Sequence, residues 1–264
     1  MNAATVLAAL QLPAGTLVHQ RVPKKLLLEQ AKLTPTLKRQ IQNGIEELTW
    51  LATLKPTTIG VPEYRDEARE YLEIAVLGLE LRPDARRDPL DLLIHRTIPY
   101  PVVLLTSQQT QPESDTGLQT GLSLTHKRAS QAEAGATVLD GTLLSVTLAG
   151  GEPAGVSVDL RQAFLESLAL GRQPRANMHS LYQGWFERLE ALLASAISGQ
   201  YTTVATPAQA EDRRAALANH ARLQREIQQL RTQAQRETQL NRRVQMNLTL
   251  QRLQAELASA SQHL

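Results

Sequence analysis

The residues best suited to chemistry are an acid and a lysine that could serve a metal-dependent nuclease. Asp84 follows Pro83, and the later triplet Thr125-His126-Lys127 lies at the end of a predicted strand. Cleavage of a phosphodiester needs clustered carboxylates that hold Mg²⁺ and a lysine that orients the attacking water. Threonine stands where the triplet needs an acid, so the pattern favours an ordinary loop acid and a surface lysine. A divergent nuclease is kept as the alternative function.

The histidines and serines do not form a second catalytic candidate. The six histidines are scattered, and no two have the i, i+4 spacing that lets one helix face present two metal ligands. His179 and Ser180 are adjacent, and adjacent residues on a helix point in different directions. We therefore expect no catalytic residue, no metal site and no cofactor.

Composition argues against several classes of protein. The chain of 264 residues has no cysteine, which excludes disulfides, zinc fingers and thiol catalysis and favours a reducing compartment. Aromatic residues make up 3% of the chain, too few for the base-stacking surfaces of single-strand-binding proteins. No apolar run approaches the length of a membrane span, and the N-terminus has no basic lead. We expect a cytoplasmic protein without a membrane segment.

Basic residues gather in two zones, although the net charge is only +2. One zone is residues 21–39; the other is residues 207–264, with nine arginines against five acids. Such zones suit a phosphate backbone or an acidic protein surface, and they also occur as solvated helix faces. The residues that we expect to bind nucleic acid or a partner are Arg21, Lys24, Lys25, Lys38, Arg39, Lys127, Arg128, Arg236, Arg242 and Arg243.

The first 205 residues predict an α+β domain. Thr34-Pro35 is a helix start, and apolar residues at spacings of three and four predict one amphipathic helix over 35–54. Asp88-Pro89 starts another helix, and Asp140-Gly141 could be a tight hairpin turn. Strands are predicted over 18–23, 70–81, 102–107, 121–128 and 137–148, a polar loop over 108–120, a linker over 149–155 and helices over 160–170 and 178–197. This pattern indicates a mixed sheet of about four to six strands flanked by helices.

Residues 206–264 predict a second region of long helices. Thr206-Pro207 with Gln209 forms a capping box, and leucine repeats follow on either side of the polar stretch "RETQLNRRVQMN" at 236–247. The two repeats differ in phase. Two antiparallel helices that fold back near 236–243 would bury each stripe on the other, with Asn241 taking the left-handed conformation in place of a glycine. A continuous helix that dimerises as a coiled coil is the alternative.

Four motifs spread along the chain match the pattern of one bacterial family. They are Arg21-Val22-Pro23-Lys24, the segment "IHRTIPYPVVLL" with His95 where the family has Asp, the strand end Lys127-Arg128, and the polar stretch 236–247. The chain resembles, over nearly its whole length, the family catalogued as domain of unknown function 4391.

The resemblance implies a context and not an activity, because the family has no assigned reaction. It implies an association with helicases and DNA methyltransferases of restriction-type phage defence. We therefore expect a non-catalytic accessory or interaction protein, with a helicase or methyltransferase of a defence complex as its protein partner and DNA as a second candidate ligand. A homodimer formed through residues 207–264 is a further possibility.

Overall fold

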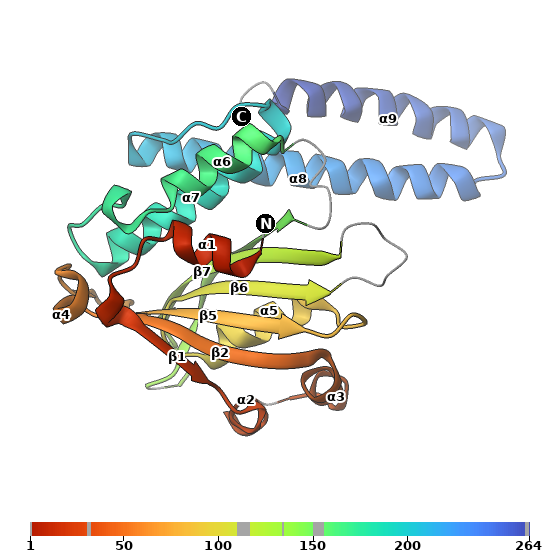
Figure 1. The fold of residues 1–264 in the computed structure, drawn as a ribbon. Helices are drawn as coiled ribbons and strands as arrows, with labels where there is room; N and C mark the ends of the chain where they lie inside the picture. The colour runs from red at the N-terminus through yellow and green to blue at the C-terminus, as the bar shows by residue number, and fades with distance from the viewer. Residues whose placement is uncertain (1, 31–32, 110–116, 134, 150–155, 262–263) are drawn as a thin grey trace. The chain divides into compact units, whose positions relative to one another are not determined.

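A six-stranded mixed sheet carries the first part of the chain (Figure 1). The computed structural model describes residues 2–30, 33–109, 117–133, 135–149, 156–261 and 264. Across the sheet, the strands are β1 (Leu17–Arg21), β2 (Ile45–Leu54), β5 (Ile74–Leu81), β6 (Val102–Gln109), β7 (Leu118–Ala129) and β8 (Thr137–Ala149). All neighbours are antiparallel except β5 and β6, which are parallel. Two short strands, β3 (Tyr64–Arg65) and β4 (Glu70–Tyr71), form a separate ribbon.

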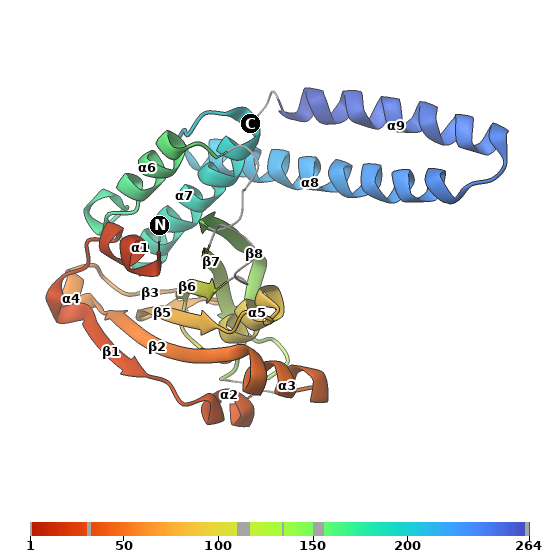
Figure 2. The same cartoon turned by 45° about the vertical axis from the view of Figure 1, so that its right-hand side comes forward.

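Helices cover both faces of the sheet. The parallel step from β5 to β6 requires a crossover, and α5 (Arg87–Thr97) supplies it. On that side, α5 shares one apolar core with β2, β5, β6 and the short helices α2 (Lys24–Gln30) and α3 (Pro35–Gly44). Figures 1 and 2 show α1 (Ala3–Ala9) on the opposite face. The hydroxyl of Tyr182, in α7 (Met178–Ser198), donates to the Val102 carbonyl oxygen at 2.8 Å and so ties α7 to the sheet.

The remaining short helices are α4 (Pro56–Ile59), α6 (Val158–Ser167) and the 3₁₀ turns Ala14–Thr16 and Leu170–Arg172.

The prediction of one helix over residues 35–54 is wrong in its second half. Helix α3 ends at Gly44, and the next ten residues form β2 between β1 and β5. The pairing of β2 with β5 shifts register twice, after Ile45 and after Trp50. Each bulge inserts one extra residue and so changes the spacing of residues on one face of the strand from two to three. The helix-like spacing of the apolar residues therefore comes from an irregular strand.

The predicted hairpin turn at Asp140-Gly141 is also wrong. Both residues lie inside β8, and Gly141 has a φ of +90°. Leu124 of β7 pairs with Leu144, whereas His126 pairs with Asp140, so β8 has extra residues between these pairs. Gly141 is thus the left-handed residue of a bulge, a conformation that glycine adopts at little cost.

The other predicted elements of this region are confirmed, with ends shifted by a few residues. The strand expected over 70–81 is interrupted, since Glu70–Tyr71 belongs to β4 and Ile74–Leu81 to β5. Of the predicted loop at 108–120, residues 110–116 lie outside the described residues. The same holds for residues 150–155 of the predicted linker.

The C-terminal region is a hairpin of two antiparallel helices, α8 (Pro207–Arg236) and α9 (Leu240–Ser261), as predicted (Figure 1). The predicted capping box of Thr206 and Gln209 starts α8. The helices bury one apolar seam against each other, so a single continuous helix is ruled out. The seam contains Leu223, Ile227 and Leu230 of α8 and Leu250, Leu253, Leu257 and Ala260 of α9.

The turn of this hairpin does not use Asn241, contrary to the sequence prediction. Asn241 lies within the first turn of α9. Among the described non-glycine residues, positive φ values occur at Gln11 and His19. The chain reverses instead through Glu237, which has extended backbone angles, and its carboxylate accepts from the Gln239 backbone N–H at 2.8 Å. An extended residue with a side-chain cap therefore replaces the left-handed turn residue.

The chain divides into two compact units. The first contains residues 1–154 and 161–189, and the second contains residues 155–160 and 190–264. The division falls inside α7 and not after residue 205, and the domain limits 1–205 and 206–264 stay a prediction. Within the described ranges, no helix has the length and apolar character that crossing a membrane requires.

We expect Leu253→Asp to open the hairpin, whereas Leu248→Asp leaves it closed. Leu253 is 8% exposed in the seam, and Leu248 is 61% exposed on the same helix. A carboxylate in the seam should cost about 2–5 kcal/mol, against about 0.5 kcal/mol at the surface. Circular dichroism during thermal unfolding and hydrogen exchange of α9 measure the difference. Equal effects of the two substitutions would contradict this packing.

Candidate functional site

The candidate basic residues of β1 and β7 lie far apart in the sheet. Arg21 ends β1 at one edge of the sheet, and Lys127 and Arg128 lie on β7. Strands β2, β5 and β6 lie between these two strands, so β1 and β7 are four strand spacings apart. At about 4.8 Å per spacing, the separation is roughly 19 Å. Arg21 therefore does not lie next to Lys127 and Arg128 in the structure.

Lys127 was expected at the surface, but the structure places it in the core. It is 3% exposed, and its ammonium group donates to the carbonyl oxygen of Ile98. Burial lowers the pKa of Lys127 to about 7. His95, also buried, lies close enough for the charge of Lys127 to act on it, and its Nε2 lies 3.0 Å from the hydroxyl of Ser123. Lys127 is therefore part of the core, and its ammonium group is not on the surface.

Three more of the predicted cations are already engaged. Lys24 is half-buried and donates to the carbonyl oxygen of Ile45. Lys25 lies 3.5 Å from Glu29 in an exposed ion pair of the i, i+4 type. Arg128 donates to its neighbour's carbonyl oxygen and lies 3.8 Å from a carboxylate oxygen of Asp140. These partners reduce what the three cations can offer to a ligand.

The remaining predicted cations are exposed. Arg21 has a weak ion pair with Glu47 at 4.0 Å, and its side chain is 71% exposed. Lys38 and Arg39 lie on the exposed face of α3. Among the described residues, neither of them forms an ion pair within 4.0 Å. Arg236, Arg242 and Arg243 are likewise exposed at the turn end of the hairpin and are without an acidic partner in the described part of the chain.

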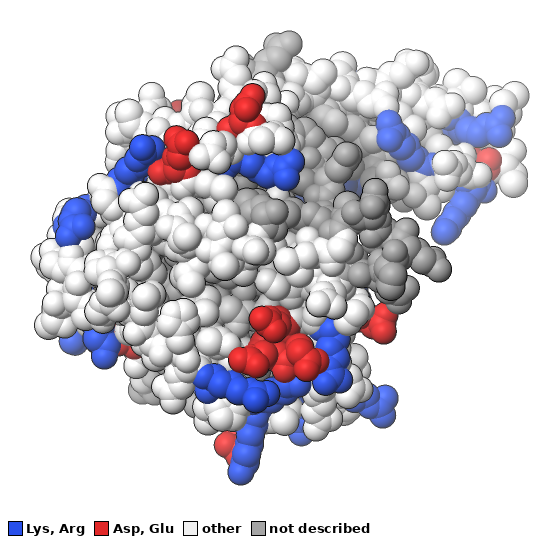
Figure 3. Space-filling model, in the orientation of Figure 1, with Lys and Arg blue, Asp and Glu red and all other residues white. Residues whose placement is uncertain are grey.

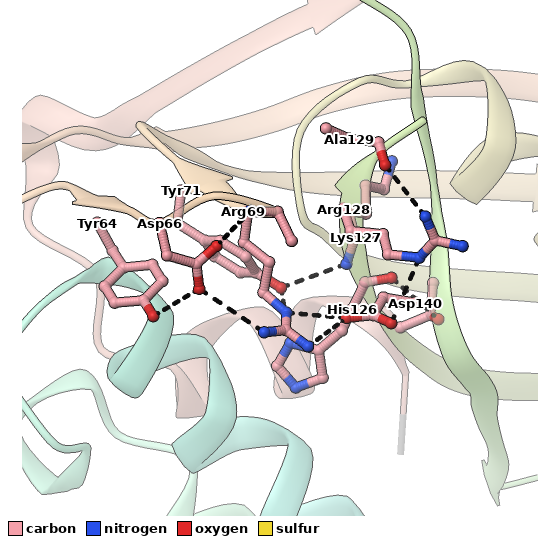
Figure 4. A network of polar contacts seen from close by, with 11 residues as sticks. Tyr64, Asp66, Arg69, Tyr71, His126, Lys127, Arg128, Ala129 and Asp140 are labelled. Carbon is pink, nitrogen blue, oxygen red and sulfur yellow. Dashed lines mark hydrogen bonds and ion pairs between the residues drawn. The ribbon is translucent and has the colours of Figure 1, made fainter. Parts of the chain in front are cut away.

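A polar network that the sequence did not reveal ties the β3–β4 ribbon to β7 and β8 (Figure 4). Arg69 donates to Asp140 through Nε at 2.8 Å and lies 2.7 Å from it through a terminal nitrogen. Asp66, on the other side of Arg69, accepts from the Tyr64 hydroxyl at 2.8 Å. The hydroxyl of Tyr71 lies 2.6 Å from Nδ1 of His126 and accepts from the backbone N–H of Lys127. No motif indicated this network, because its members are far apart in sequence.

The imidazole and phenol groups of this network are held neutral. Burial, and then the neighbouring His179, lower the pKa of His126 to about 4, and the two imidazole ring centres lie 5.3 Å apart. Burial raises the pKa of Tyr71 far above its ordinary value. A phenol and an imidazole that both stay neutral near pH 7 hold the ribbon on the sheet but provide no charged catalytic group.

A second buried polar centre joins α5 to the sheet. Arg87 pairs with Asp91 at 2.9 Å and donates to the hydroxyls of Ser145 and Thr147 on β8. Asp91 is fully buried and also accepts from Thr106 at 2.8 Å. Burial raises the pKa of Asp91, and Arg87 opposes this shift. The pair uses its hydrogen bonds within the protein, so we interpret it as structural.

The residues of the predicted nuclease pattern, Asp84 and the triplet Thr125-His126-Lys127, do not form a catalytic site in the structure. Thr125 is buried, and its backbone N–H donates to the Tyr182 hydroxyl; Lys127 is buried as described above. Asp84 lies in the turn that follows β5, beyond the end of that strand. Within the part of the chain that the structure describes, no three His, Cys, Asp or Glu side chains are grouped so that they could hold a metal ion.

The turn end of the hairpin forms a surface that the sequence had only partly indicated. Three large apolar side chains of α9 are exposed there: Leu240 (63%), Val244 (49%) and Leu248 (61%). The predicted Arg236, Arg242 and Arg243 belong to the same end of the hairpin, as does Arg231 near the end of α8, and Figure 3 shows that cations outnumber acids on the visible side of this end. We call these seven residues the hairpin-end surface. The i, i+4 spacing of the three apolar residues was the signal that could have found it.

Lys127 should make stability depend on pH in the alkaline range. Its pKa is about 7 in the folded protein and 10.5 in a solvated chain, so the unfolded state holds more protons between these values. The free energy of unfolding should therefore rise as the pH increases from about 7 toward 10.5, and Lys127→Met should flatten this rise. Denaturant titrations across this range measure it, with Lys25→Met as the exposed control. An identical slope in wild type and Lys127→Met would contradict the burial of the charge.

Comparison with known proteins gives one match. The family model described as "Domain of unknown function (DUF4391)" matches residues 10–257, nearly the whole chain. No curated protein and no solved structure matches the chain. The match agrees with the resemblance of the motifs at the start, middle and end of the sequence. The chain therefore belongs to the family of domain of unknown function 4391.

Proposed function

We propose that this protein is a cytoplasmic, non-catalytic accessory protein that binds a partner protein through the hairpin-end surface. The observation that carries the proposal is the exposure of Leu240, Val244 and Leu248 on the end of the hairpin that also carries arginines without an acidic partner among the described residues. Exposed apolar side chains gathered on one face commonly mark a site of protein–protein contact.

The position of the apolar stripe supports a protein partner. At about 100° per residue, the stripe lies roughly 150° around α9 from the seam formed by Leu250, Leu253 and Leu257. Packing of α8 on α9 therefore cannot bury it. A nucleic acid would pair its phosphates with the arginines but would not bury the three apolar side chains. A protein surface can form ion pairs with the arginines and also bury the apolar side chains.

The biological setting of the proposal comes from the family resemblance alone. That resemblance implies association with helicases and DNA methyltransferases of restriction-type phage defence, so we propose one of these enzymes as the partner. A homodimer through residues 207–264 would use the same apolar stripe. The nine arginines and five acids of this region would then place like charge against like charge, which disfavours self-association.

We expect the double substitution Leu240→Glu with Leu248→Glu to abolish partner binding without unfolding the protein. Both side chains are more than half exposed, so the fold should lose less than about 0.5 kcal/mol, whereas a buried interface would lose two apolar anchors. Quantitative co-purification of the tagged full chain from its own host measures the effect. A candidate helicase or methyltransferase is then confirmed by binding of the two purified proteins.

The matched control is Gln228→Glu with Gln229→Glu, which adds the same charge at exposed positions of α8. The control should retain the partner that the double leucine variant loses. Retention of the same proteins by wild type, control and leucine variant would contradict the proposal. Light scattering of the wild type tests the homodimer separately.

DNA is the second candidate ligand, favoured by the exposed cations of α3. Lys38 and Arg39 are solvent-exposed, and in the described chain they have no ion-pair partner. If they contact phosphates, Lys38→Glu with Arg39→Glu should weaken duplex binding and reduce the slope of log K against log salt by about 0.9 for each lost contact. Fluorescence anisotropy at several salt concentrations measures this, with Lys55→Glu, which removes a cation paired with Glu73, as control. If the wild type does not bind duplex DNA at low salt, DNA is excluded as a ligand of this surface.

A further inference from the structure

A half-open cavity lies beside the edge strand β1, within the first compact unit. Its volume is about 380 Å³, and its walls come from β1, α2, β2 and the residues that follow α5. Leu27 and Ile98, which belong to the apolar core, form part of the lining, and the exposed side chains of Val18 and Leu26 lie at the same cavity. This volume is within the range of about 300–1,000 Å³ in which proteins bind small molecules, near its lower end.

The walls of the cavity suit a flat apolar group. Trp50 and Tyr100 line it with their rings in an edge-to-face arrangement, 6.5 Å between centres and 76° between planes. Pro23 and Pro99 also line it. Aromatic rings add offset and edge-to-face attraction to the burial of a ring, so these walls favour an aromatic ligand over a branched aliphatic one.

Each polar side chain that lines the cavity can donate a hydrogen bond: Gln20, Arg21, Thr53 and Thr97. Thr97 Oγ1 is buried and makes no hydrogen bond with the described residues. Thr53 Oγ1 accepts from the Trp50 indole N–H at 2.7 Å, which leaves the hydroxyl proton of Thr53 to donate elsewhere. Arg21 provides the one charge among the described lining residues, and only a 4.0 Å contact with Glu47 engages it. A cation and two hydroxyls without a lining acid favour an anionic ligand.

We propose that this cavity binds a small aromatic carboxylate of one or two rings, with the ring packed against Trp50 and Tyr100 and the carboxylate paired with Arg21. The carboxylate accepts from the guanidinium, and the Thr97 hydroxyl gains the partner that it lacks in the described chain. This site is separate from the hairpin-end surface, because all its residues belong to the first compact unit. It does not depend on the proposed partner-binding function.

The two tryptophans of the chain allow a direct test. Trp50 lines the cavity, whereas Trp185 is 1% exposed and its indole N–H donates to the Leu168 carbonyl oxygen. We would titrate the ¹⁵N-labelled full chain with benzoate, 4-hydroxybenzoate, indole-3-carboxylate and 2-naphthoate, and with the matched amides. At least one acid should shift the indole signal of Trp50 in a saturable way and leave that of Trp185 unchanged. Trp50→Phe assigns the signals.

Variants then locate the ligand. Arg21→Gln should raise the Kd of the bound acid by roughly tenfold or more, because a charge-assisted hydrogen bond is lost, and it should not unfold the protein since the side chain is 71% exposed. Lys25→Gln, which changes a nearby cation outside the cavity, should leave the Kd nearly unchanged. The proposal is overturned if no acid of the panel shifts the Trp50 signal up to millimolar concentration. It is also overturned if acids and amides bind equally, or if Arg21→Gln binds like wild type.

Discussion

The position of α5 under the sheet depends on the buried ion pair between Arg87 and Asp91. The side chains are 13% and 0% exposed, so loss of either partner would leave a buried charge uncompensated, at a cost of about 3–5 kcal/mol. The guanidinium crosses β7 at Gly121, where an added Cβ would lie 2.0 Å from the Arg87 Cζ, and reaches Thr147 on β8. A side chain at position 121 would displace the guanidinium. Because α5 is also the crossover that makes β5 and β6 parallel, one pair fixes the helix relative to three strands.

Lys127 shows a different response to burial. No acid lies among its hydrogen-bond or ion-pair partners in the described chain, and its ammonium group reaches only a backbone carbonyl oxygen. His95 lies near it and is neutral, since burial and then Lys127 lower the pKa of His95 to about 3. The family resemblance places an aspartate at position 95, and a carboxylate there would supply the missing counter-ion. With histidine, the protein lowers the pKa of the lysine to about 7 instead of pairing its charge.

The sequence predicted the elements whose signals lie among neighbouring residues of the chain. It did not predict the features that arise from the pairing of distant strands. The capping box at Thr206 and the seam of leucines predicted the hairpin, because both are properties of the helices themselves. Residues 45–54 were misread because two bulges give a strand the apolar spacing of a helix, and bulges arise from pairing with β5. The sequence could not place Arg21 of β1 relative to Lys127 and Arg128 of β7, because their distance depends on the order of the strands. Which cations share a surface therefore could not be predicted without the sheet topology.

The sequence of α9 suits a bundle of more than two helices. Its inner stripe, with Leu253 at the centre, is covered by α8, whereas the outer stripe from Leu240 to Leu248 is exposed. A hairpin has one seam, so a second apolar stripe on nearly the opposite side contributes to stability only when a further element covers it. Arg242 and Arg243 belong to the same end of α9, and the carboxylate of Glu237 at the turn already accepts from the Gln239 backbone N–H. An element that covered this stripe would bury Leu240, Val244 and Leu248 at once, and acidic residues on that element would be attracted to the arginines of this end, whereas a second copy of the hairpin would bring nine more arginines against five acids.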